Sequence, residues 1–411
     1  MKGRQTTGST SRLALFGGNP TFEAALHVGR PNVGDRERFA RRIDVMFDRR
    51  WLTNNGAYVR ELESRLARLL DVRHCIAVCN GTTALQIMAK ACGFDGEIIM
   101  PSFTFVATAH ALEWQGVTPV FCDIDPATHN IDPAKVEELI TSETSAILGV
   151  HVWGRACDVE TLEGVALRHG LGLCFDAAHA FACSTASRMI GGGGLAEAFS
   201  FHATKFFNTF EGGAITTNDD QVAARCRRMR DFGFAGIDRV ESLGINGKMN
   251  EASAAMGLTN LEALQTFIDT NERNHRLYRS GLEGIPGLTL VLYPQGEQCN
   301  FQYVVIEIDE STSALSRDEL QAVLHAENVL ARRYFFPGCH RMPPYRDRVL
   351  QAPLTETDRL TGRTLALPTG TAVTAEDVAA VCGIIRLAAS DAAAVRAAVA
   401  ATTAGDTALA R

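Results

Sequence analysis

The sequence predicts an α/β protein in which a mainly parallel sheet is covered by helices on both faces. Short, fully apolar runs alternate with longer amphipathic runs up to about residue 250. Apolar runs of this kind are typical of strands buried on both sides, and their alternation with helices is typical of parallel sheets. The chain is 46% hydrophobic and 21% charged, which excludes a mostly disordered chain, a collagen and a coiled coil.

The predicted elements of this first part follow one another as strand and helix. We expect strands at 75–78, 97–100, 119–124, 146–152, 171–175, 198–202 and 214–217. We expect helices near 82–93, 104–115, 133–140, 158–169 and 219–232. This order predicts helical crossovers between neighbouring parallel strands.

The pattern changes near residue 251. Two long helices are predicted over 251–268 and 271–284, followed by a strand at 302–308, a helix at 316–327 and a last helix at 375–388. We therefore predict a large α/β domain over 13–265, a smaller α+β domain over 266–390, and flexible tails at 1–12 and 391–411.

Charge and cysteine usage exclude several classes of protein. The formal net charge is −7, so no general basic field attracts nucleic acid or an anionic membrane. No apolar run reaches the ~18–20 residues that span a bilayer, and no signal peptide is evident. The eleven cysteines contain no C-x-x-C pair, which favours reduced, buried thiols in a cytoplasmic protein and no metal site.

Lysines are scarce, so a mechanism that needs one has few candidates. Lys205 follows a short apolar run in Ser-Phe-His-Ala-Thr-Lys-Phe-Phe and lies among several phenylalanines. Partial desolvation lowers the pKa of an amine and makes it nucleophilic near neutral pH, as a Schiff-base lysine requires. The alternative is a solvated loop lysine without a function.

A candidate partner carboxylate ends the strand at 171–175. Asp176 lies in Leu-Cys-Phe-Asp-Ala-Ala-His, and acidic residues at the carboxyl ends of such strands face the ligand crevice. A carboxylate there can keep the ring nitrogen of pyridoxal phosphate protonated. The alternative is a helix N-cap.

Two further segments fit a flat, phosphorylated ligand. Val-Cys-Asn-Gly-Thr-Thr-Ala-Leu at 78–85 reads as a strand, a glycine turn and a helix start, which suits a phosphate at Gly81, Thr82 and Thr83. Pro-Ser-Phe-Thr-Phe at 101–105 offers Phe105 as a cover for a ring, although core packing explains a phenylalanine equally well.

Together these motifs resemble the nucleotide-sugar aminotransferases of the DegT/StrS family. The resemblance extends over roughly residues 15 to 390 and includes Gly-Ile-Asn-Gly-Lys-Met-Asn-Glu at 244–251. It implies the fold type I of pyridoxal-phosphate-dependent transferases, which is aspartate aminotransferase-like. His-Val-Trp-Gly-Arg at 151–155 and Tyr-Phe-Phe-Pro-Gly-Cys-His at 334–340 are most similar to the TDP-4-keto-6-deoxyglucose 4-aminotransferases of actinomycete deoxysugar pathways.

The resemblance assigns roles to individual residues. Lys205 matches the lysine that carries pyridoxal phosphate and moves the proton, and Asp176 matches the acid at the ring nitrogen. His179 stands where most members have glutamine, facing the cofactor O3′. The remaining assignments are Phe105 for stacking, Gly81, Thr82, Thr83 and Ser200 for the phosphate, Asn246 for the phosphate of a neighbouring subunit, and His340 and Tyr334 for the sugar.

The implied reaction moves the amino group of L-glutamate to the 4-keto carbon of TDP-4-keto-6-deoxy-D-glucose. The products are TDP-4-amino-4,6-dideoxy-D-glucose and 2-oxoglutarate, in deoxyaminosugar biosynthesis for a secondary metabolite such as an antibiotic. The resemblance also implies a homodimer with a shared active site. Two alternatives stay open: the same chemistry at C3 of a nucleotide keto sugar or on a keto-inositol, and a non-catalytic cofactor-binding regulator.

Overall fold

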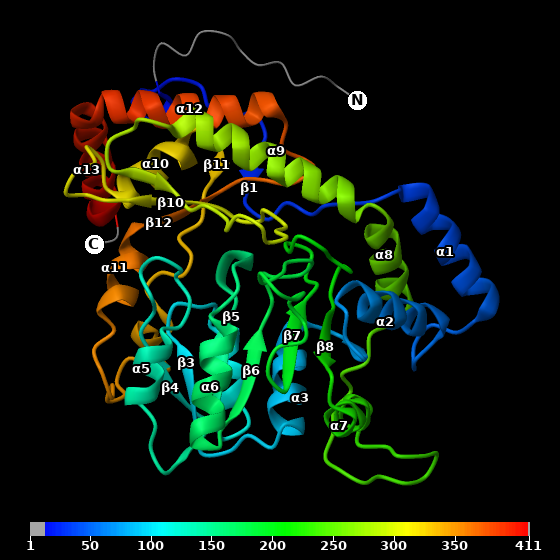
Figure 1. The fold of residues 1–411 in the computed structure, drawn as a ribbon. Helices are drawn as coiled ribbons and strands as arrows, with labels where there is room; N and C mark the ends of the chain where they lie inside the picture. The colour runs from blue at the N-terminus through cyan, green and yellow to red at the C-terminus, as the bar shows by residue number, and fades with distance from the viewer. Residues whose placement is uncertain (1–12, 410–411) are drawn as a thin grey trace.

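A seven-stranded sheet forms the centre of the larger part of the molecule (Figure 1). The computed structural model describes residues 13–409, with side chains described to residue 401. The strands lie in the order β2 (His74–Val78), β8 (Gly213–Thr217), β7 (Ala196–Ser200), β6 (Gly172–Asp176), β5 (Thr144–Val150), β3 (Glu97–Pro101) and β4 (Thr118–Cys122). Only β8 runs antiparallel to its neighbours, so the predicted mainly parallel sheet is confirmed.

Helices cover both faces of this sheet, because nearly every strand residue is buried. One face is covered by α3 (Gly81–Ala91), α4 (Ala107–Glu113) and α7 (Asp220–Arg230). The other face is covered by α5 (Pro133–Glu138) and α6 (Val159–His169), which lie in front of the sheet in Figure 1. These helices agree with the predicted ones to within a few residues at each end.

Three more helices pack beside the sheet: α1 (Arg36–Arg49), α2 (Ala57–Leu69) and α8 (Glu251–Glu262). Val59, Leu62 and Leu66 lie at helical spacing on α2 and are fully buried in the core beneath α8. The sequence analysis passed over α1 and α2. Both helices are rich in arginine and glutamate, and their apolar side chains form only a narrow stripe.

The C-terminal part contains a second core around a small antiparallel sheet. Its strands lie in the order β12 (Thr364–Leu367), β10 (Val304–Ile308) and β9 (Leu288–Leu290). The helices of this part are α9 (Leu264–Leu282), α10 (Arg317–Ala326), α11 (Thr355–Arg363), α12 (Ala375–Ser390) and α13 (Ala392–Leu409). Most of their buried apolar side chains join one cluster, separate from the clusters around the large sheet.

Two expectations about helix ends differ from the structure. The helix predicted to run from 251 to 268 ends at Glu262, and α9 continues in a new direction from Leu264 (Figure 1). The tail predicted from residue 391 is wrong over its first part, since α13 forms there. Val395 of α13 is fully buried in the C-terminal core, which holds the helix in place. The tail predicted at 1–12 lies outside the described residues.

The first described residues pack against the C-terminal part. The strand β1 (Leu26–His27) pairs in parallel with β11 (Val329–Leu330), and Leu13, Phe22 and Leu26 join the C-terminal core. The Glu327 carboxylate accepts hydrogen bonds from the main-chain N–H groups of Ala14 and Thr21. This arm was expected in the large domain, but its contacts lie with the residues after 265.

No single described helix is long and apolar enough to cross a membrane. The pair formed by α12 and residues 392–401 passes that test only when the two helices are taken together, and they are bent by 91° at their junction.

Candidate active site

A cavity of about 610 Å³ lies at the carboxyl ends of the central strands. Val150, Asp176 and Ser200 end β5, β6 and β7 and line its floor, where ligands bind in open α/β sheets. Tyr334 and Phe335 line it from the C-terminal part. The sequence-predicted residues that line the cavity are Gly81, Thr82, Phe105, Asp176, His179, Ser200, Lys205 and Tyr334.

Lys205 presents a free amine to this cavity. It lies in the turn after β7, where its N–H donates to the His202 carbonyl at 2.9 Å. Phe206 and Phe207 follow it into the core and are buried. Among the described residues the amine has no hydrogen-bond or ion-pair partner. Burial lowers the pKa of Lys205 while Asp176 opposes the shift, so the amine is a stronger nucleophile near neutral pH than an exposed one.

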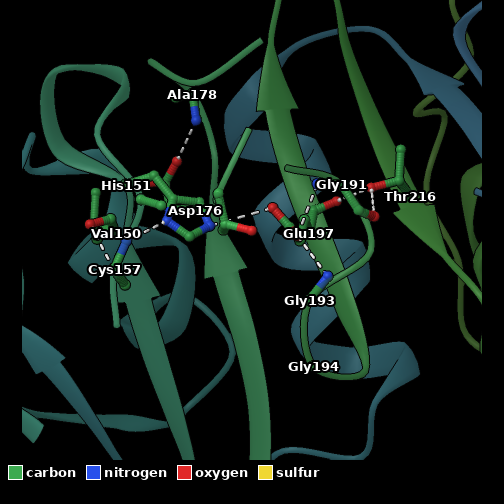
Figure 2. Close-up of polar contacts among 12 residues, drawn as sticks. Val150, His151, Cys157, Asp176, Ala178, Gly191, Gly193, Gly194, Glu197 and Thr216 are labelled. Atoms are coloured by element: carbon green, nitrogen blue, oxygen red, sulfur yellow. Dashed lines mark hydrogen bonds and ion pairs between the residues drawn. The ribbon is translucent and has the colours of Figure 1, made fainter. Parts of the chain in front are cut away.

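Asp176 ends β6 with its carboxylate buried at the same cavity. Oδ1 accepts the Ala178 N–H at 3.0 Å, as Figure 2 shows, and Oδ2 accepts the Thr108 hydroxyl at 2.8 Å. Burial raises the pKa of Asp176, and these two donors oppose the shift by stabilising the ionised form. The predicted pair of amine and carboxylate therefore lies in one site.

A second polar group supports the end of β6 from behind (Figure 2). The His151 main-chain N–H donates to the Asp176 carbonyl at 3.0 Å, and the His151 ring stacks on Phe175 with a centroid distance of 4.7 Å. Its Nε2 faces the buried Glu197 carboxylate of β7 at 3.4 Å. These contacts link the ends of β5, β6 and β7, so the strand that carries Asp176 is held on both sides.

His179 is a neutral donor facing the cavity. Burial, together with nearby Lys205, lowers the pKa of His179 well below its ordinary value. Its Nδ1 accepts the Trp153 main-chain N–H at 3.3 Å, which leaves the proton on Nε2. The ring stacks near Trp153 and Phe335 and lies 4.5 Å from the Tyr303 ring centroid, so its orientation is fixed.

The start of α3 forms a close-fitting cradle against the end of β7. A Cβ placed on Gly81 would lie 2.7 Å from the Ser200 Cβ, so only glycine allows this approach. Asn80 caps the helix by accepting the Thr83 N–H at 2.8 Å. The positive end of the helix, the Thr82 side chain and the Ser200 hydroxyl then border one end of the cavity, which suits a phosphate.

Three predicted residues lie outside the cavity lining. Thr83 is buried, with its hydroxyl accepting the Cys79 thiol at 3.4 Å. Asn246 lies exposed on the loop after α7, consistent with a contact to another subunit but not a test of one. His340 has both ring nitrogens engaged, Nδ1 with Ser102 at 2.7 Å and Nε2 with Asp358 at 3.1 Å. Their assignments to cofactor and sugar stay predictions.

Comparison with known proteins decides the family. Residues 34–386 match the DegT/DnrJ/EryC1/StrS aminotransferase family, which is most of the chain. The chain belongs to this family. Membership agrees with the predicted resemblance and with the fold, since the similar solved structures are aminotransferases of the same architecture.

Individual relatives within the DegT/DnrJ/EryC1/StrS family are similar over most of their length. A dTDP-4-amino-4,6-dideoxy-D-glucose transaminase of Shigella dysenteriae is 38% identical over 77% of this chain and 86% of its own. One of Escherichia coli is 37% identical over 79% and 87%. The crystal structure of DesI in the presence of its TDP-sugar product superposes with a TM-score of 0.91, at 50% identity, covering 95% of this chain and 99% of DesI.

The structure adds cavity residues that the sequence analysis of this family member missed. Thr104 and Thr108 lie within the quoted segment after β3, but only Phe105 was singled out there. Tyr303 and Arg332 come from the C-terminal part and reach the same cavity. No local pattern marks these two, because their place in the site depends on how the C-terminal part packs on the large sheet.

Proposed function

We propose that the chain transfers the amino group of L-glutamate to the 4-keto carbon of TDP-4-keto-6-deoxy-D-glucose. The products are TDP-4-amino-4,6-dideoxy-D-glucose and 2-oxoglutarate. Sugar aminotransfer follows from the family, and the two curated relatives and DesI carry names that favour a TDP-sugar and position 4.

One observation about the site carries this proposal. The free amine of Lys205 and the buried carboxylate of Asp176 line the same cavity, whose other end is the glycine cradle at Gly81. A nucleophilic amine, a fixed carboxylate and an anion cradle are the groups that a phosphorylated pyridine aldehyde requires.

The residues present fit pyridoxal phosphate. Gly81, Thr82 and Ser200 supply a phosphate-sized cradle that a single Cβ would fill, and Asp176 and His179 supply a fixed acceptor and a fixed donor. We propose that these residues and Lys205 hold the cofactor. When bound, the cofactor accepts the electron pair left on the amino-acid α-carbon when its proton leaves.

The side chains then divide the remaining work. The Nζ of Lys205, with its lowered pKa, takes the proton from the α-carbon of glutamate and later delivers a proton to the sugar C4. Asp176 holds a negative charge at the cavity floor, where it favours a cationic ring. Tyr334 and Phe335 close the cavity from the C-terminal part and limit access of water.

We also propose a homodimer in which Asn246 contacts the cofactor phosphate of the other subunit. The loop after α7 exposes Phe232, Phe234, Ile237, Val240, Leu243 and Ile245. So many exposed apolar side chains on one loop are typical of a protein interface. In Figure 1 this loop extends away from the sheet beside α7.

A cytoplasmic location and a role in the biosynthesis of an amino sugar for a secondary metabolite complete the proposal. The cysteines of the described residues are all free thiols, which suits a reducing compartment.

The decisive experiment supplies the purified chain with pyridoxal phosphate, L-glutamate and a panel of TDP-keto sugars. Nuclear magnetic resonance of the product locates the new amine. Transfer to C4 supports the proposal. Transfer only to C3, or only to a keto-inositol added to the panel, supports the first alternative. Cofactor binding without transfer to any acceptor supports a regulator.

A further inference from the structure

The carboxylate of Asp176 receives one of its two hydrogen bonds from a residue that has no role in the proposal so far. The Thr108 Oγ1 lies 2.8 Å from Asp176 Oδ2, and Thr108 is only 1% exposed. Thr108 lies in the first turn of α4, directly after the segment that leaves β3. A buried carboxylate oxygen depends strongly on such a donor, because water cannot replace it.

A second hydroxyl stands behind the first. Thr104 Oγ1 lies 3.0 Å from Thr108 Oγ1, and Thr104 is 2% exposed. The Thr108 hydroxyl also lies 3.0 Å from the Phe105 carbonyl, so its single proton has two candidate acceptors. The charged oxygen of Asp176 is the stronger acceptor.

The direction of the protons follows from these partners. An ionised carboxylate can only accept, so the Thr108 proton points to Asp176. The Thr108 oxygen is then free to accept the Thr104 proton. Hydrogen bonds aligned in this way strengthen one another.

The C-terminal part fixes the position of this pair. The Cys339 N–H donates to the Ser102 carbonyl at 3.0 Å, and the Cys339 thiol donates to the Thr104 carbonyl at 3.4 Å. Thr104 and Thr108 both line the cavity, so the pair connects the cavity wall to its floor.

We propose that Thr104 and Thr108 form a two-hydroxyl chain that holds the Asp176 carboxylate ionised and aimed into the cavity. Thr108 is thus a positioning residue, and Thr104 supports it. The cofactor part of this inference rests on the proposed function, whereas the effect on Asp176 itself does not.

Other charged groups also face Asp176, and they set the background of the test. Lys205 approaches from the turn after β7, and His151 approaches from the end of β5, with Glu197 of β7 behind it. His179 faces the same cavity as a neutral ring. None of these groups changes in the threonine variants, so a shift in Asp176 reports the hydroxyl chain.

The first measurement uses the full chain without added cofactor. Carbon-13 NMR follows the titration of labelled aspartate carboxyls, and D176N identifies the Asp176 signal. T108V removes the hydroxyl at nearly constant shape and is expected to raise the Asp176 pKa by about one unit, a tenfold change in proton affinity. T108S keeps the hydroxyl and is expected to restore the wild-type value, while T104V gives a smaller rise.

The matched control is T361V. Thr361 is also buried, but its hydroxyl donates to the Asp358 carbonyl in its own helix, far from Asp176 in the sequence. Its titration is expected to equal the wild type. An unchanged Asp176 pKa in T108V, or an equal rise in T108S and T108V, overturns the proposal.

The second measurement adds pyridoxal phosphate. T108V is expected to bind it about tenfold more weakly and to shift the pH midpoint of the visible absorbance, and T108S is expected to do neither. If the wild type binds no pyridoxal phosphate, the proposed function fails, and the titration without cofactor still decides the role of the two threonines. Equal cofactor affinity and absorbance in T108V and the wild type count against the positioning role.

Discussion

At the scale of single residues, the site depends on two opposite effects of burial. Burial lowers the pKa of the Lys205 amine and raises that of the Asp176 carboxyl. Each shift brings the charged and neutral forms closer in free energy. The amine has no partner among the described residues, whereas the carboxylate has two donors. One group is therefore free to react while the other is held in place.

This difference makes Lys205→Ala a clean test of chemistry against stability. The variant is expected to show no visible absorbance with pyridoxal phosphate and no amino transfer, because no other amine lines the cavity. Its melting temperature is expected to stay near that of the wild type, since no contact is lost. Absorbance spectra, borohydride labelling and calorimetry measure the three quantities.

The control for this variant is Lys90→Ala, which changes an exposed lysine at the end of α3. It is expected to keep full absorbance and activity. A borohydride-stable label in Lys205→Ala equal to that of the wild type would show that another residue carries the cofactor.

At the scale of elements, three strand ends and one helix start create the cavity. Strands β5, β6 and β7 are parallel neighbours, so their carboxyl ends meet at one edge. The start of α3 approaches the end of β7 at Gly81 and Ser200. The cradle is therefore a contact between two elements, more than 100 positions apart in the chain.

Gly81→Ala tests this contact. The added Cβ would lie 2.7 Å from the Ser200 Cβ, so the helix start must shift away from β7. We expect the affinity for pyridoxal phosphate to fall at least about tenfold and the free energy of unfolding to fall by roughly 1–3 kcal/mol. Cofactor titration and chemical denaturation measure these changes.

Gly383→Ala is the matched control, because nothing lies within 4 Å of a Cβ at this position in α12. It is expected to leave cofactor binding unchanged and to stabilise the chain slightly, since alanine favours a helix. Equal cofactor affinity in Gly81→Ala and Gly383→Ala would show that the cradle does not hold the phosphate.

At the scale of the whole molecule, polar contacts fasten the C-terminal part to the large sheet. Asp123, directly after β4, accepts the N–H groups of Glu356 and Thr357 at 2.9 and 2.8 Å and lies 3.2 Å from the Lys135 amine. Burial raises the pKa of Asp123, but these donors outweigh it, so the pKa lies below the ordinary 3.8. The division into domains at residue 265 stays a proposal that these contacts complicate.

Asp123→Asn is expected to reduce the free energy of unfolding by roughly 2–3 kcal/mol at pH 7, because it removes a charged acceptor from buried donors. A lowered folded pKa stabilises the ionised form. The difference from the wild type should therefore be constant from pH 8 to about pH 5 and shrink as the pH falls below 3.8 towards the folded value. Urea denaturation at several pH values measures it.

Asp269→Asn changes an exposed carboxylate on α9 and serves as the control, with an expected change within about 0.5 kcal/mol. If the effect of Asp123→Asn instead grows on acidification, the carboxylate is not the ionised acceptor described here.

The exposed loop after α7 predicts assembly. Ile237 and Leu243 are 94% and 84% exposed, so replacing both by aspartate costs little in the single chain. We expect the double variant to be monomeric and to bind pyridoxal phosphate more weakly, because Asn246 on the same loop is proposed to serve the other subunit. Light scattering after size-exclusion chromatography measures the mass.

Leu167→Asp provides the comparison, since Leu167 is 85% exposed on α6, away from this loop. It is expected to stay dimeric. A wild-type chain that is monomeric at micromolar concentration would contradict the proposed dimer.

The sequence by itself determined the fold class, the family and the chemistry at Lys205 and Asp176, because each depends on a short apolar strand and the few residues that follow it. Only the tertiary structure decided that Thr108 binds Asp176, that Tyr303 and Arg332 reach the cavity, and that His340 is held between Ser102 and Asp358. It also decided that α13 packs on the C-terminal core. These contacts join residues from separate elements, and their distances depend on how the elements pack rather than on any local pattern.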